Sequence, residues 1–108
     1  SQKNIMEESR GKYISLQMFF YKQGTIGQQS GMDKILSSPG ILGGGFLLPN
    51  GTEIRNRENS TQRAGYFIAS GESISEVNTR TKSAFKMLKS LDINGKSMLS
   101  HPPVLLPE

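Results

Sequence analysis

The sequence predicts an α+β fold in which a small antiparallel sheet carries a long C-terminal helix and a short helix, both packed on one face. Three stretches lead to this fold class: an alternating strand at residues 13–21, a short helical spacing at residues 28–37, and a strand, turn and helix at residues 63–91. A chain of 108 residues has room for one domain with a modest core.

The first strand is expected at residues 13–21, where successive side chains would point to opposite sides of a sheet. One face would carry four apolar side chains, so the strand is buried on at least one side. These residues are Ile14, Leu16, Met18 and Phe20. Residues 22–27 then read as a turn leading into a short extended piece, in which Gly24 is expected to take a positive φ.

The middle of the chain predicts a short helix and a hairpin. Met32, Ile35 and Leu36 have helical spacing within residues 28–37, and Pro39-Gly40 would end the helix. Residues 41–48 are apolar with three consecutive glycines, which suits an extended segment with a bulge or a close backbone approach. The turn signal at residues 49–52 then predicts a hairpin over residues 46–55.

Residues 63–91 form the best-defined unit. An aromatic and β-branched strand ends at Gly71, which would supply the backbone freedom for the turn. Ser73 is expected to cap the helix, with the Glu76 carboxylate reaching back to the N–H of the cap residue itself. Apolar residues at three- and four-residue spacing predict a helical face that runs to Leu91, and Arg80 would pair with Glu76 one turn away. Residues 96–108 are predicted to form an extended, proline-rich tail.

Composition excludes several classes of function. The absence of cysteine excludes a disulfide framework, a thiolate zinc site and a cysteine nucleophile, and it fits a cytoplasmic setting. No apolar run is long enough for a membrane span. The net charge of +4 raises the question of an acidic partner, but the basic residues are scattered, so nucleic acid is not expected. No carboxylates converge on a metal, and His101, in the tail, reads as an ordinary surface residue; no catalytic residue is predicted.

Three arginines around a polar loop are the candidate binding residues. Arg55, Arg57 and Arg63 could hold an anion, because guanidinium groups match carboxylate and phosphate oxygens. The alternative is a solvated loop, and we favour it over an anion site.

Several runs together resemble the C-terminal subdomain of ATP-grasp ligases, most closely the L-amino acid ligases and similar carboxylate–amine ligases. The runs are residues 18–26, 39–41, 49–54 and 63–73, followed by the amphipathic helix. Residues 92–95 after the helix are also similar to the corresponding end of biotin carboxylase-like enzymes. The resemblance covers residues 13–95 and depends on the order and spacing of these runs.

The resemblance implies a piece of a larger enzyme. Residues 1–12 would connect to an upstream domain, residues 13–95 would be the subdomain, and residues 96–108 the tail. ATP and Mg²⁺ would be held by the upstream domain, because the Glu-x-Asn-x-Arg type of run is absent here. The chain alone would then be inactive, and its role would be to pack on the ATP-grasp domains of the same polypeptide and close one side of the active site.

Within the resemblance, Arg63 matches the arginine that precedes the family strand, whereas Arg55 and Arg57 have no such match. A face that normally packs on the other domains would be an exposed apolar patch in the separate chain, which could then form homo-oligomers. The alternative function is a free-standing α+β binding module without enzyme activity.

Overall fold

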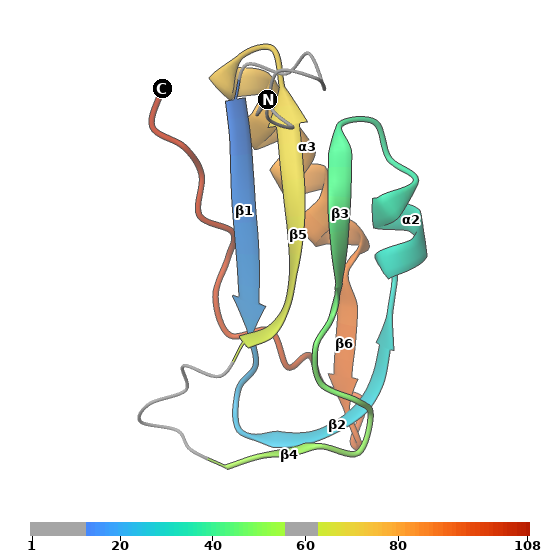
Figure 1. Cartoon of the computed structure of the whole chain (residues 1–108). Helices are drawn as coiled ribbons and strands as arrows, with labels where there is room; N and C mark the ends of the chain where they lie inside the picture. Colours follow the sequence, from blue (N-terminus) through green and yellow to red (C-terminus); the bar gives the residue numbers. More distant parts are fainter. Residues whose placement is uncertain (1–12, 56–62) are drawn as a thin grey trace, which may run out of the picture.

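The chain folds into two small antiparallel sheets with helices on one side, in the residues that the computed structural model describes, 13–55 and 63–108 (Figure 1). The first sheet has the strand order β1-β5-β3 and the second β4-β2-β6. The predicted α+β class is confirmed, and its strands form two sheets instead of one. In chain order the elements are β1 (Tyr13–Phe20), β2 (Gly24–Ser30), α2 (Met32–Leu36), β3 (Ile41–Phe46), β4 (Glu53–Ile54), β5 (Arg63–Gly71), α3 (Ile74–Met87) and β6 (Lys89–Asp92).

Strand β5 is the centre of the first sheet, and it pairs with β1 on one side and β3 on the other. Leu16 lies opposite Ile68 in one register, and Gly44 lies opposite Phe67 in the other. Gly44 permits this approach, because a Cβ there would lie 2.8 Å from the carbonyl oxygen of Tyr66. The interrupted apolar run is therefore a strand in which Gly44 serves a close backbone approach.

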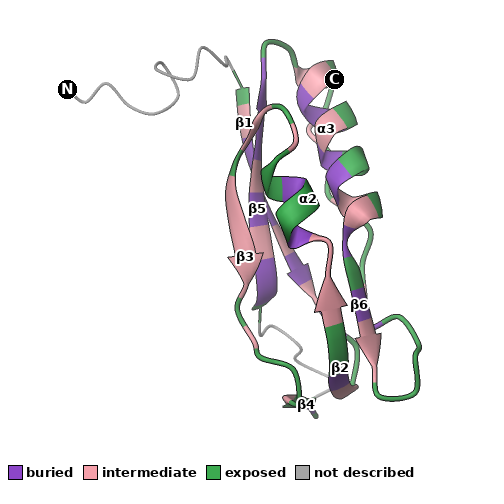
Figure 2. Cartoon of the chain, turned by 90° about the vertical axis from the view of Figure 1, so that its right-hand side faces the viewer, coloured by how far each residue is buried: buried purple, intermediate pink, exposed green. Residues whose placement is uncertain are grey.

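The core lies between the first sheet and the helices, which sit on the same side of it (Figure 2). Phe67 on β5 and Ile35 on α2 are fully buried. The residues that join them in one buried cluster are Phe19, Tyr21, Ile26, Met32, Ile54, Ala64, Ala84, Leu88 and Met98. Strand β1 contributes Phe19 to this cluster, which is a residue of the opposite face from Leu16.

The hairpin predicted over residues 46–55 is wrong. Strand β3 pairs with β5, and β4 pairs with β2. The turn at residues 49–52 does form, since the N–H of Thr52 donates to the Pro49 carbonyl at 3.2 Å. However, its Gly51 N–H donates to the Ile26 carbonyl at 2.7 Å, so the turn is attached to β2. The turn chemistry is local, whereas the choice of partner strand depends on segments distant in sequence.

The short helix begins at Met32, four residues later than residue 28, because residues up to Ser30 belong to β2. Gly31 makes the sharp transition with a φ of 96°. A Cβ at this position would lie 2.0 Å from the carbonyl oxygen of Met87, so the β2–α2 junction fits against the end of α3 only with glycine there.

The long helix ends at Met87 and does not continue to Leu91 as predicted. Leu88 has an extended backbone, with φ −73° and ψ 128°, and remains buried. Residues Lys89–Asp92 form β6, which pairs antiparallel with β2. The apolar residues after Met87 continue the helical spacing but lie in a strand. They do so because pairing with β2 satisfies the main-chain N–H and C=O groups of this segment.

The tail is attached to the rest of the chain. The Met98 side chain is buried, and the Met98 carbonyl accepts a hydrogen bond from the Lys22 N–H at 2.7 Å. The Ser100 N–H donates to the Phe20 carbonyl at 3.0 Å. The predicted extended tail therefore packs on β1 and its exit, without needing a neighbouring molecule.

Candidate functional site

The outer face of the first sheet, away from the helices, is the main candidate for a contact with another domain (Figure 2). Leu16 is 54% exposed on this face, and Gly43 and Gly45 of β3 have open space where a Cβ would be. The outer face is defined by Ile14, Leu16, Met18 and Phe20 of β1, Tyr66 and Ile68 of β5, and Gly43 and Gly45 of β3. This set is apolar, and the exposed Arg63 lies opposite Phe20 at its end.

Strand β1 carries the polar Ser15 and Gln17 as well as the core residue Phe19 toward the helices, and only apolar side chains toward the outside. Ser15 and Gln17 are 6% and 5% exposed on the helix side, whereas their neighbour Leu16 is more than half exposed. An ordinary half-buried strand shows the reverse arrangement, with apolar residues toward the core. Leu16 is exposed and the other apolar side chains of this face are half-buried, and an apolar surface that is partly open to solvent is typical of a protein contact site.

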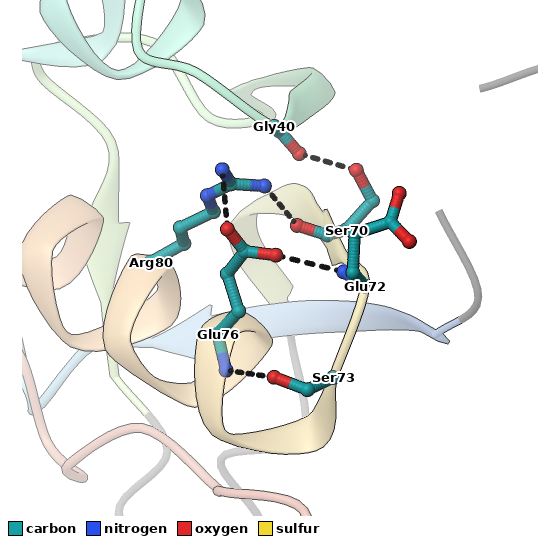
Figure 3. Close-up of polar contacts among 6 residues, drawn as sticks. All are labelled: Gly40, Ser70, Glu72, Ser73, Glu76 and Arg80. Atoms are coloured by element: carbon teal, nitrogen blue, oxygen red, sulfur yellow. Dashed lines mark hydrogen bonds and ion pairs between the residues drawn. The ribbon is translucent and has the colours of Figure 1, made fainter. Parts of the chain in front are cut away.

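A hydrogen-bond network closes the β5–α3 junction (Figure 3). Ser73 is the N-cap of α3, and its Oγ accepts from the Glu76 N–H at 3.1 Å. The Glu76 carboxylate accepts from the Glu72 N–H at 2.8 Å, one residue before the N–H that the sequence suggested. Gly71 does not have a positive φ; its lack of a side chain gives room to Glu76, whose Cβ would lie 3.1 Å from a Cβ at Gly71.

Arg80 connects this junction to the start of β3. One guanidinium nitrogen donates to the Glu76 carboxylate at 2.9 Å, and the other donates to the Ser70 carbonyl at 2.9 Å (Figure 3). The Ser70 Oγ in turn donates to the Gly40 carbonyl at 2.8 Å. Because both ends of its guanidinium are already bonded, Arg80 holds three segments together and is not an open receptor for an anion.

Two of the three predicted binding arginines, Arg55 and Arg63, have exposed side chains. Arg63 is exposed at the beginning of β5. Arg55 is also exposed, and it pairs with Glu53 at 3.3 Å, an ion pair whose partners are both mostly in solvent. Arg57 lies outside the described residues.

Gly24 has a φ of 148°, which is the positive value that the sequence predicts for this turn residue.

Two hollows lie on the helix side. One, of about 350 Å³, is lined by Lys82, Phe85, Lys86, Pro102, Pro103 and Leu105, between α3 and the tail. The other, of about 270 Å³, lies beside Arg80 and is lined in part by Pro39, Ile41 and Met87. His101 is exposed, its Nδ1 2.7 Å from the Ser100 Oγ.

No group of three metal-ligating side chains gathers within residues 13–55 and 63–108. Within the same ranges, no helix has the length and apolar character to cross a membrane.

Two ionisable side chains have shifted pKa values for structural reasons. Burial raises the pKa of Tyr21, whose hydroxyl donates to Gln29 Oε1 at 2.5 Å and lies 2.6 Å from Ser90 Oγ. A hydrogen bond from the Lys96 N–H, aided by one from the Asn94 N–H, lowers the pKa of Asp92. Neither group faces a nucleophile or a base, so both shifts reflect folding and not catalysis.

Comparison with known proteins decides the family. A family model described as L-amino acid ligase C-terminal domain 2 matches residues 17–90, more than half of the chain. The chain belongs to this family. No curated protein and no solved structure matches it.

The L-amino acid ligase C-terminal domain match runs from within β1 to within β6. It includes Arg63 and the whole junction of Ser73, Glu76 and Arg80, while the tail lies beyond it. Sequence reasoning missed two further residues of the matched region, Gln17 and Asn78, which bind the tail. Asn78 lies among the apolar positions of its helix, which is a sequence signal, whereas Gln17 lies on the strand face opposite to the predicted apolar one and had none.

Proposed function

We propose that this domain is a non-catalytic part of an ATP-dependent carboxylate–amine ligase and that its outer face packs on the ATP-grasp domains of the same polypeptide, closing one side of the active site. ATP and Mg²⁺ would be held by those domains. Membership of the L-amino acid ligase family supports the parent activity.

The observation that carries the docking role is the apolar outer face. Six apolar side chains from β1 and β5 lie on it next to two glycines, and both helices are on the other side. A largely apolar sheet surface suits a large, permanent contact better than a transient polar one. A domain linked in sequence to the ligase core is the partner that such a contact requires, and no free-standing role accounts for the family match as well.

The test uses the ligase polypeptide that contains this domain. Leu16→Lys places a charge in the centre of the proposed contact, where an unpaired buried charge costs about 3 kcal/mol or more. We expect ATP-dependent phosphate release with a mixture of L-amino acids to fall at least tenfold. The control is Ile93→Lys, which changes a 68% exposed residue beyond β6, away from the outer face, and should leave activity unchanged.

Two further readouts separate docking from misfolding. The domain alone should keep its unfolding midpoint in the Leu16→Lys variant, because the side chain is already more than half exposed. Any concentration-dependent association of the domain alone should be lost in this variant and kept in Ile93→Lys. The proposal is refuted if the two ligase variants are equally active, or if the polypeptide carries no upstream Glu-x-Asn-x-Arg type of run.

A further inference from the structure

Two side-chain amides hold a short segment of the tail, residues 104–106, which we call the strap. The Gln17 Nε2 donates to the Val104 carbonyl at 2.6 Å, and the Val104 N–H donates to Gln17 Oε1 at 3.3 Å. Similarly, the Asn78 Nδ2 donates to the Leu106 carbonyl at 2.9 Å, and the Leu106 N–H donates to Asn78 Oδ1 at 2.8 Å. Each amide therefore pairs with both main-chain polar groups of one residue.

The two amides are buried and depend on the strap for these bonds. Gln17 on β1 is 5% exposed and Asn78 on α3 is 4% exposed. Buried polar groups are almost always hydrogen-bonded, and here the strap both covers the two amides and supplies main-chain partners to them. Without an occupant, both amides would lose these main-chain partners. Gln17 Nε2 would keep its bond to Ser15 Oγ at 2.8 Å, whereas the further bond of Asn78 Nδ2, to Glu108 Oε2 at 3.4 Å, also belongs to the tail. The arrangement has the character of a binding site that is filled by the protein's own chain.

The contacts recognise the main chain and not particular side chains. Val104 and Leu106 are alternate residues of an extended segment, so their N–H and C=O groups point to the same side. The Val104 side chain is 75% exposed, and Leu105 between them lines the hollow of about 350 Å³ beside α3. Main-chain pairing with side-chain pockets at alternate positions is how extended peptides are recognised in strand addition. Figure 1 shows the red tail running beside β1 as an extended trace.

The strap is separable from the rest of the tail. Met98 and Ser100 are bonded to the exit of β1 by contacts that do not involve the amides. Pro102 and Pro103, which have no N–H and a restricted φ, stand between these anchors and the strap. In addition, Gln17 and Asn78 both lie within the family match, whereas the strap lies beyond it.

We propose that Gln17 and Asn78 form a binding site for the main chain of an extended peptide, which the strap fills within its own chain. The ligand class is any extended segment with a free N–H and C=O at two alternate positions and an apolar side chain between them. The site would otherwise select weakly among peptide sequences, because the side chain at the position of Val104 is in solvent. The site is independent of the outer face and of the proposed ligase role.

The first experiment compares the full chain with a variant that ends at residue 101. The probe is a fluorescent peptide with the sequence of residues 101–108, followed by fluorescence anisotropy. We expect saturable binding to the shortened variant and at least tenfold weaker binding to the full chain, because a tethered strap competes at an effective concentration on the millimolar scale. A peptide with Val104→Ser should bind within about twofold of the original, since its side chain is exposed.

Matched N-methylation identifies the main-chain contact. Methylation at the Leu106 nitrogen removes the donor to Asn78 and should weaken binding about tenfold, whereas methylation at the Leu105 nitrogen should change it less than twofold. Asn78→Leu in the protein should weaken the original peptide by a similar factor, and Asn94→Leu, on an exposed turn, should not. Equal losses from the two methylated peptides, or no binding to a shortened variant with a native circular dichroism spectrum, would overturn the proposal.

A measurement on the full chain covers the case in which the shortened variant does not fold. Hydrogen exchange by NMR should be slower at the Val104 and Leu106 amides than at the Leu105 amide, which points away from the two side chains. Asn78→Leu should accelerate exchange at Leu106 while the Lys22 amide, bonded to Met98, stays protected. Equal exchange at the three strap amides would contradict the site.

Discussion

Replacing Gly31 by alanine tests whether the β2–α2 junction is fixed by its contact with the end of α3. The change forces a residue with a Cβ into a φ of 96° and places that Cβ 2.0 Å from the Met87 carbonyl oxygen. Gly51→Ala is a matched control, because Gly51 has a φ of 95° but open space around its Cβ position. The difference between the two variants isolates the steric contact from the backbone strain.

The magnitude follows from these two contributions. A non-glycine residue at such a φ costs about 1–2 kcal/mol, and this is the whole expected loss at Gly51. At Gly31 the overlap with Met87 adds about 1–3 kcal/mol, because main-chain atoms of two packed elements must move apart. We expect a total of about 2–5 kcal/mol, a large part of the 5–15 kcal/mol that is typical for a domain of this size.

Urea unfolding followed by circular dichroism measures both variants. With a typical slope of about 1–3 kcal/mol per molar, the Gly31 midpoint should fall by about 2 M and the Gly51 midpoint by less than half as much. Equal shifts in the two variants would refute the steric argument and leave only the backbone conformation. A hydrogen-exchange profile should place the added exchange in the Gly31→Ala variant at α2 and at the end of α3.

The remaining predictions concern the polar network of the domain. Arg80→Met should lower the free energy of unfolding by about 1–2 kcal/mol, because it removes the Glu76 ion pair and leaves the Ser70 carbonyl without its donor. Arg55→Met removes only an exposed pair and should change unfolding by less than about 0.5 kcal/mol, so similar losses in urea titrations would contradict the role given to Arg80. Burial raises the pKa of Tyr21 above its usual 10.0, so folding favours the protonated phenol. The contribution of Tyr21 to stability is therefore fully present below pH 10 and should be lost as the pH rises above it. Tyr21→Phe should flatten that decline in urea titrations, and an unchanged slope would show that another group is responsible.

Local chemistry in the sequence predicted the parts of the fold that depend on neighbours in the chain. Ser73 caps α3 because its hydroxyl needs only an N–H three residues later. The Glu76–Arg80 pair follows from helical geometry in the same way. The carboxylate of Glu76, however, bonds to the Glu72 N–H, because the end of β5 brings that group within reach.

The candidate site was less predictable than the fold. The resemblance identified the ligase family correctly, whereas a binding role for Arg55, Arg57 and Arg63 stays a prediction. The residues that bind another segment, Gln17 and Asn78, had no motif to mark them. Their role follows from the path of the tail, which returns to β1 after almost the full length of the chain.

By itself, the sequence determined the α+β class, the alternation in β1, the capped helix α3 and the family. The tertiary structure alone decided that the apolar side of β1 faces outward, because alternation defines two faces without saying which one the helices cover. It also decided that residues after Met87 form a strand, since apolar spacing there is compatible with a helix until β2 is present as a partner. These choices depend on contacts between segments that are distant in sequence. A local sequence pattern does not determine the free energies of such contacts.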